Sequence, residues 1–82
     1  MAYSIDIRKT NETTSTVEYS FDGGGFDIQH GSGLLSIDKI SGEVNILKHQ
    51  GTDWERLYDK VIMKLAKHWQ ASEFPEKTSW QA

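Results

Sequence analysis

Cysteine is absent from this chain of 82 residues, and proline occurs only once. Without cysteine, neither a disulfide framework nor a thiolate metal site is possible, and we expect a protein of a reducing compartment, the cytoplasm. No apolar run approaches the roughly 20 residues of a membrane span, and residues 1–9 hold no apolar signal segment. The sequence therefore predicts one small soluble domain with no membrane association.

The net charge of −3 is unevenly distributed along the chain. Residues 1–47 hold three basic and seven acidic residues, a net charge of −4, whereas residues 48–82 hold six basic and five acidic residues, a net charge of +1. Charge of this kind bears on partners and association rather than on fold. We therefore expect the N-terminal part of the chain to be acidic and the C-terminal part to be slightly basic.

The apolar residues change their period near residue 50. Up to Leu47 they alternate with polar residues, which is typical of half-buried strands. From Trp54 they recur every three or four residues, which is typical of an amphipathic helix. This order predicts an α+β fold, in which an antiparallel meander sheet of four or five strands carries one C-terminal amphipathic helix on one face, in two layers.

Glycine and polar clusters divide the first half of the chain into strands. We predict a single domain over 1–70, with a tail, 71–82, that is either docked or frayed. The strands of the domain lie within 3–47. Three are predicted at 3–8, 16–21 and 26–30, a fourth contains Leu35 and Ile37, and a fifth contains Val44 and Ile46. The glycine-rich segments 22–25 and 31–33 and the loop 38–43 are predicted to be turns. Three residues, Leu34, Ile40 and Leu47, fall out of phase, and they either cap the sheet edges or indicate a register slip of one residue.

The helix is predicted over 53–70. Thr52 is the expected N-cap, and Glu55 three residues later completes a capping box. The apolar stripe runs for about four turns, through Trp54, Leu57, Tyr58, Val61, Ile62, Leu65, Ala66 and Trp69. The helix is expected to end before Pro75, because proline disfavours a helical residue ahead of it.

These patterns predict which residues form the core and which face solvent. The expected core residues are Ile5, Ile7, Val17, Tyr19, Phe21, Ile28, Leu35, Ile37, Val44, Ile46, Leu57, Val61, Ile62 and Leu65. Because one helix covers one sheet face, the opposite face is left to water or to a partner. Its expected residues are Ser4, Asp6, Arg8, Thr16, Glu18, Ser20, Asp27, Gln29, Ser36, Asp38, Glu43 and Asn45.

No motif in the chain indicates catalysis, a cofactor or a metal. The glycine clusters are followed by a strand pattern rather than by a helix, so they are read as turns rather than as a phosphate-binding loop. The three histidines, His30, His49 and His68, lack the spacing of metal ligands, and His30 is expected on the core face near a turn. We therefore predict no catalytic residues, no cofactor, no metal and no enzymatic activity.

The polar sheet face suggests a non-enzymatic module that binds a protein partner, which its acidic character would favour if that partner were basic. Small immunity or inhibitor proteins have this size and charge. The expected partner-binding residues are Asp6, Glu18, Asp27, Gln29, Asp38 and Trp80. One alternative is a homo-oligomer formed through an unpaired edge strand or the tail with Trp80. A second alternative is nucleic-acid binding by the helix ridge of Arg56, Lys60, Lys64 and Lys67, although interleaved acids favour a solvated helix face.

Overall fold

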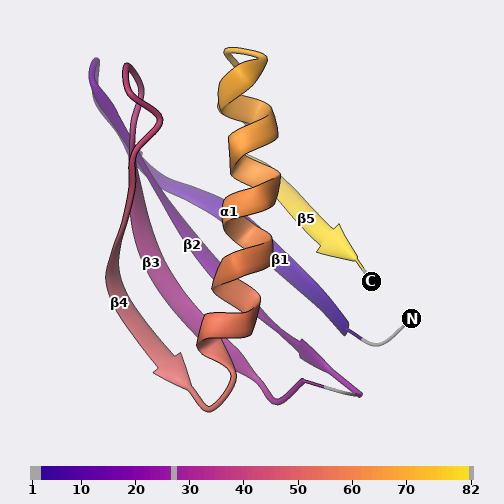
Figure 1. Cartoon of the computed structure of the whole chain (residues 1–82). Helices are drawn as coiled ribbons and strands as arrows, with labels where there is room; N and C mark the ends of the chain where they lie inside the picture. Colours follow the sequence, from indigo (N-terminus) through magenta and orange to yellow (C-terminus); the bar gives the residue numbers. More distant parts are fainter. Residues whose placement is uncertain (1–2, 27, 82) are drawn as a thin grey trace.

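Residues 3–26 and 28–81 are described by the computed structural model, and within them the chain forms five strands and one helix (Figure 1). The strands are β1 (Tyr3–Glu12), β2 (Thr16–Gly25), β3 (Gly31–Asp38), β4 (Val44–Gly51) and β5 (Lys77–Gln81), and the helix is α1 (Trp54–Gln70). All strand pairs are antiparallel, and the order in the sheet is β4-β3-β2-β1-β5. The predicted α+β fold, an antiparallel meander with one helix packed on it, is confirmed.

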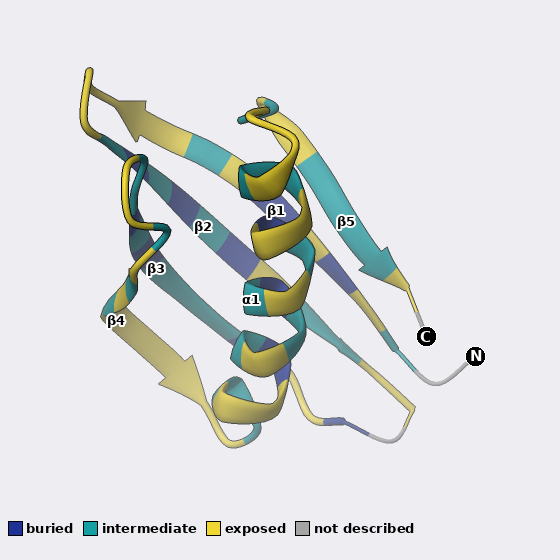
Figure 2. Cartoon of the chain, turned by 45° about the horizontal axis from the view of Figure 1, so that its top comes forward, coloured by how far each residue is buried: buried dark blue, intermediate teal, exposed yellow. Residues whose placement is uncertain are grey.

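The helix α1 lies across one face of the sheet and leaves the other face uncovered (Figures 1 and 2). Strands β1 to β4 follow one another as a meander, and β5 returns after the helix to pair with the free edge of β1. Within residues 3–26 and 28–81, no helix combines the length and the apolar character that crossing a membrane requires.

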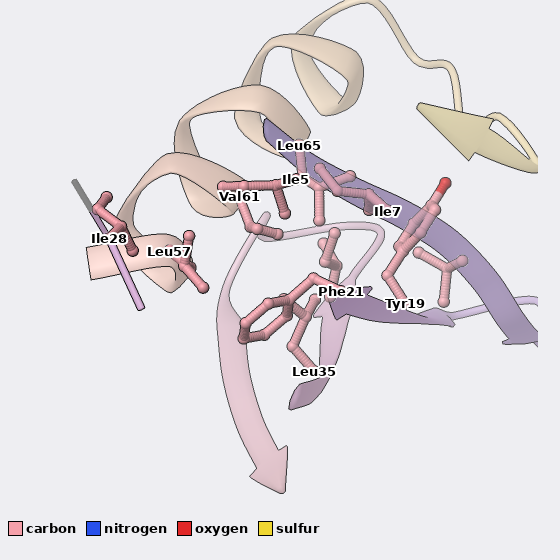
Figure 3. Close-up of a cluster of buried hydrophobic side chains, with 11 residues drawn as sticks. Ile5, Ile7, Tyr19, Phe21, Ile28, Leu35, Leu57, Val61 and Leu65 are labelled. Atoms are coloured by element: carbon pink, nitrogen blue, oxygen red, sulfur yellow. The ribbon is translucent and has the colours of Figure 1, made fainter. Parts of the chain in front are cut away.

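The core lies between α1 and the sheet (Figure 3). Its buried apolar residues all belong to the predicted core, and they are Ile5, Ile7, Val17, Tyr19, Phe21, Ile28, Leu35, Ile37, Leu57, Val61 and Leu65. Val44, Ile46 and Ile62 were expected there but are only half-buried. For the first two the reason is that β4 is an edge strand, so its side chains have neighbours on one side only.

Two glycines make room for aromatic rings. Gly33 is paired with Phe21, and a Cβ on Gly33 would lie 2.6 Å from Cζ of that ring. Gly42 has a φ of +77°, and a Cβ there would lie 2.9 Å from the indole of Trp69. The same indole donates its Nε1–H to the carbonyl of Lys39, at 2.9 Å, so the C-terminal end of α1 is fixed to the loop between β3 and β4.

The predicted third strand, 26–30, is wrong. Residues 26 and 28–30 form no strand, β2 continues through the predicted turn 22–25, and β3 begins in the predicted turn at Gly31. The N–H of Gly25 donates to the carbonyl of Ile28 at 2.9 Å, which closes a tight connection between the two strands. Ile28 still reaches the core from this connection, which explains why its apolar character mimicked a strand.

The predicted capping box at the start of α1 is also wrong. The residue at the N-cap is Asp53, one position after Thr52, and its side chain accepts no capping hydrogen bond from the backbone of α1. Its Oδ2 instead accepts the backbone N–H of Gln29 at 2.8 Å. The carboxylate therefore ties the connection between β2 and β3 to the start of the helix.

The C-terminal segment is part of the sheet. In β5, Trp80 is paired with Ile5 and packs against the core, and Lys60 on α1 lies over its ring. The hydroxyl of Tyr19 donates to the carbonyl of Pro75 at 2.7 Å, which fixes the connection between α1 and β5 to the core.

Candidate functional site

The face of the sheet opposite α1 is called here the open face, and it is polar. Its residues alternate along the strands with those that face α1, apart from the irregularity at Leu47, and the strand register brings them side by side. They are Ser4, Asp6, Arg8 and Asn11 on β1, Thr16, Glu18, Ser20 and Asp22 on β2, Ser32, Leu34, Ser36 and Asp38 on β3, Asn45, Lys48 and Gln50 on β4, and Lys77, Ser79 and Gln81 on β5.

One row across the open face is acidic. The cross-strand pairs place its residues in the order Ser79, Asp6, Asp22, Ser32, Gln50, and we call it the acidic row. Its two carboxylates belong to residues that are direct cross-strand partners, and both residues are exposed. Like charges directly opposite each other destabilise a sheet, so this pair costs the fold some stability.

The neighbouring row is basic. Its residues follow one another in the order Lys77, Arg8, Ser20, Leu34, Lys48, and we call it the basic row. The next row holds Glu18, Ser36 and Asn45. The open face is therefore striped with charges of both signs rather than uniformly acidic, because β4 and β5 add lysines to it.

Two hollows open on this face and share Asp22. The larger, with a volume of about 720 Å³, lies between the two rows, with Ser20, Asp22, Ser32, Leu34, Leu47, Lys48 and Gln50 among its lining residues. The smaller, of about 400 Å³, is lined by Ser4, Asp6, Asp22, the glycines 23–25, Ile28, Gln29 and His30. The register of β4 shifts opposite Leu34, and Leu47 at this irregularity is 50% exposed. Leu34 and Leu47, which fell out of phase in the sequence, thus give the larger hollow an apolar part.

The connection between β2 and β3 borders the smaller hollow. His30 was expected on the core face, but it is exposed, and its Nε2 lies 2.5 Å from Oδ1 of Asp22. Phe26 in the same connection is 95% exposed. Exposed aromatic side chains are frequent anchors at protein interfaces.

The predicted site residues are partly brought together. Asp6 and Gln29 both line the smaller hollow, and Glu18 lies two rows away on the open face. Asp38 is at the far end of β3, where its Oδ1 accepts the N–H groups of Ile40 and Ser41 at 2.8 and 3.1 Å. Because these backbone N–H groups, that of Ser41 foremost, stabilise the charged form, the pKa of Asp38 is lowered.

The predicted site residue Trp80 does not join this group. Trp80 lies on the face covered by α1, with its ring beside Lys60. Asp27 lies outside the described residues.

Sequence reasoning missed several residues of the open face, namely Asp22, Ser32, Leu34, Lys48, Gln50, Lys77 and Ser79. In the sequence, the inward residues Tyr19 and Phe21 are followed by the polar Asp22, which continues the alternation of the strand. The strand pattern therefore already extended into the segment interpreted as a turn. In the tail, Thr78 and Trp80 alternate with Lys77 and Ser79, which is a short strand signal.

The described charged groups of the open face lie at its surface and do not form a metal site. Among the described residues, no three His, Asp or Glu side chains converge in a way that could hold a metal ion. The charged residues that line the two hollows, Asp6, Asp22, His30 and Lys48 among them, are exposed. A striped face of this kind matches a surface with the complementary charge pattern.

The basic ridge of α1 is partly engaged within the molecule. Arg56 lies 4.0 Å from Asp53, and the ammonium of Lys60 lies 5.7 Å from the ring centre of Trp80.

Comparison of this chain with protein-family models, with curated proteins and with solved structures gave no match.

Proposed function

We propose that this protein is a non-enzymatic binding module whose open face recognises a protein partner. The observation that carries the proposal is the direct opposition of Asp6 and Asp22 on a face that no other element covers. A cationic group of a partner placed between the two carboxylates would offset their repulsion. An inhibitor or immunity-type protein acting in the cytoplasm is one member of this class.

The charge pattern defines what the partner must present. A basic group fits the acidic row, and an acidic group fits Arg8 and the two lysines of the basic row. Complementary charges of this kind chiefly raise the association rate and exclude wrong partners. Affinity then depends on apolar contacts, for which Leu34, Leu47 and Phe26 are available near the two hollows.

A matched pair of charge reversals tests the proposal. Three proteins are immobilised: the wild type, the open-face variant Asp6→Lys/Asp22→Lys, and the control Glu55→Lys/Glu73→Lys. Both variants change the net charge equally, and the control residues are exposed, one on α1 and one after it. Each immobilised protein is incubated with a lysate of the source organism at low salt, and the proteins that it retains are identified by mass spectrometry.

We expect a protein that the wild type and the control retain and that the open-face variant loses. Raising the salt concentration should release it, because screening weakens contacts between exposed charges. Retention of the same proteins by all three, or loss from both variants, would contradict the assignment of the open face as the binding surface.

A further inference from the structure

We infer that the partner of the open face is a second copy of this chain, an inference that rests on the proposed function and names its partner. The acidic row and the basic row are neighbours, two residues apart along each strand, which corresponds to about 7 Å. Stripes of opposite charge that lie side by side on one face are self-complementary. A closed dimer needs such a face, because the same patch meets itself across a two-fold axis.

The arrangement of the two copies follows from the cross-strand register of the sheet. A two-fold axis that runs between the two rows, in the plane of the face, places the acidic row of one copy on the basic row of the other. Asp6 then faces Arg8 of the second copy, and the symmetry repeats this pair. On the other strands the same axis pairs neutral with charged or neutral residues: Ser79 with Lys77, Asp22 with Ser20, Ser32 with Leu34, and Gln50 with Lys48.

The flanking rows agree with this arrangement. Glu18 lies in the row beyond the basic row, and the same axis places it opposite the row of Ser4 and Gly24. That row carries no charged residue on β1 or β2, so no two like charges of the acidic row, the basic row and the Glu18 row meet. A uniformly acidic face would repel its copy, whereas this striped face does not.

The open face is large enough for a dimer interface. The molecule measures 37 × 23 × 18 Å, and the two longer of these dimensions limit the extent of any one face. A standard interface buries about 800 Å² of each partner, which is comparable with the extent of such a face.

The edges of the sheet are poorer candidates for self-association. The edge strand β4 carries the irregularity at Leu47, and the opposite edge strand β5 has only five residues and begins with a lysine. Irregularities, short edge strands and lysines are the usual means of preventing edge pairing.

A charge-swap experiment on the pair Asp6 and Arg8 tests the inference. Sedimentation velocity is measured for the wild type, Asp6→Arg, Arg8→Asp, an equal mixture of these two variants, and the double variant Asp6→Arg/Arg8→Asp. Concentrations run from about 10 µM to about 1 mM, since weak dimers fall in this range, and circular dichroism checks that each protein is folded. Glu55→Arg on α1 is the control.

The wild type and the control should dimerise at low salt, and each single variant should be at least about tenfold weaker, because it places two like-charged pairs across the axis. The equal mixture and the double variant should both regain the dimer, because each restores two opposite-charged pairs. A monomeric wild type, dimers that persist in both single variants, or a mixture that stays monomeric would each overturn the inference. If the wild type is monomeric but the Asp6→Lys/Asp22→Lys variant still loses a retained protein, the inference fails and the proposed function stands.

Discussion

Asp6 of β1 and Asp22 of β2 are direct cross-strand partners on the open face, and within the described residues Asp6 has no ion-pair partner. Two carboxylates in this position destabilise the sheet, by about 0.2–1 kcal/mol for a like-charged pair. Residues that serve binding often reduce stability in this way. The proposed binding role of the open face rests on this pair.

Replacing Asp6 by Asn should stabilise the protein while weakening binding through the open face. The free energy of unfolding should rise by about 0.2–1 kcal/mol, because the like-charged pair is removed and the shape of the side chain is kept. Urea denaturation measures the change. The control is Glu18→Gln on the same face, whose cross-strand partners Asn11 and Ser36 are neutral. An equal gain in both variants would show that the general negative charge, and not this pair, is responsible.

Gly33→Ala should destabilise the core. The added Cβ would lie 2.6 Å from the ring of Phe21 and 2.7 Å from the carbonyl oxygen of Lys48, so the ring or the strand must shift. Forced overpacking costs about 1–3 kcal/mol. Ser36→Ala on the same strand is the control, and its free energy of unfolding should change by less than about 0.5 kcal/mol. A Gly33→Ala variant as stable as this control would show that Phe21 does not pack on the glycine.

Tyr19→Phe should lower the free energy of unfolding by about 1 kcal/mol at neutral pH, because the bond from the hydroxyl to Pro75 is lost. The pKa of Tyr19 is raised to about 12, chiefly by burial and further by the charges of Glu12 and Glu76. Above pH 10 the unfolded chain ionises this group while the folded protein keeps it neutral, so stability falls between pH 10 and about 12.

The phenylalanine variant should lack this part of the alkaline loss, and urea denaturation on both sides of pH 10 measures it. Tyr3→Phe is the control, since Tyr3 packs against the core but the bond to Pro75 belongs to Tyr19. An alkaline loss that is the same in wild type and Tyr19→Phe would contradict the buried state of this hydroxyl.

Glu12→Gln should remove part of the acid sensitivity of the fold. The carboxylate lies 2.6 Å from the ammonium of Lys39 and 2.7 Å from that of Lys9, and these hydrogen bonds, the one from Lys39 foremost, lower the pKa of Glu12 to about 2. A depressed pKa stabilises the folded state above the ordinary value of 4.5, and this contribution is lost as the pH falls from 4.5 to about 2.

The difference in unfolding free energy between wild type and Glu12→Gln should therefore shrink through that window. It should also be smaller at high salt, because exposed ion pairs are screened. Glu55→Gln, on the outer side of α1, serves as the control. A difference that is independent of pH would show that Glu12 does not act through its charge.

The fold class could be predicted because alternation and helical spacing are local properties of the sequence. Every buried apolar residue in the described part lies in phase with one of these two periods, except Ile28. Ile28 enters the core from an irregular connection, which no period reports. Likewise Asp53 displaced Thr52 at the start of α1, because its carboxylate bonds to Gln29, a residue distant in the sequence.

The open face was harder to predict than the core. Asp6, Arg8 and Glu18 follow from alternation within one strand. Lys48 does not, because it lies after the irregularity at Leu47. Lys77 alternates with Trp80, but over only five residues, which is a weak strand signal. The stripes of charge arise from the register between strands, which the sequence of each strand does not contain.

Chemical labelling of carboxylates tests most directly whether the open face is the binding surface of this protein. The protein is treated with a carbodiimide and an amine, once dilute at high salt and once concentrated at low salt or together with a protein that it retains, and each carboxylate is quantified by mass spectrometry. We predict that labelling of Asp6, Asp22 and Glu18 falls in the associated state, while labelling of Glu55 and Asp59 on α1 stays the same. Protection of the two carboxylates on α1, with unchanged labelling of the open face, would contradict the account.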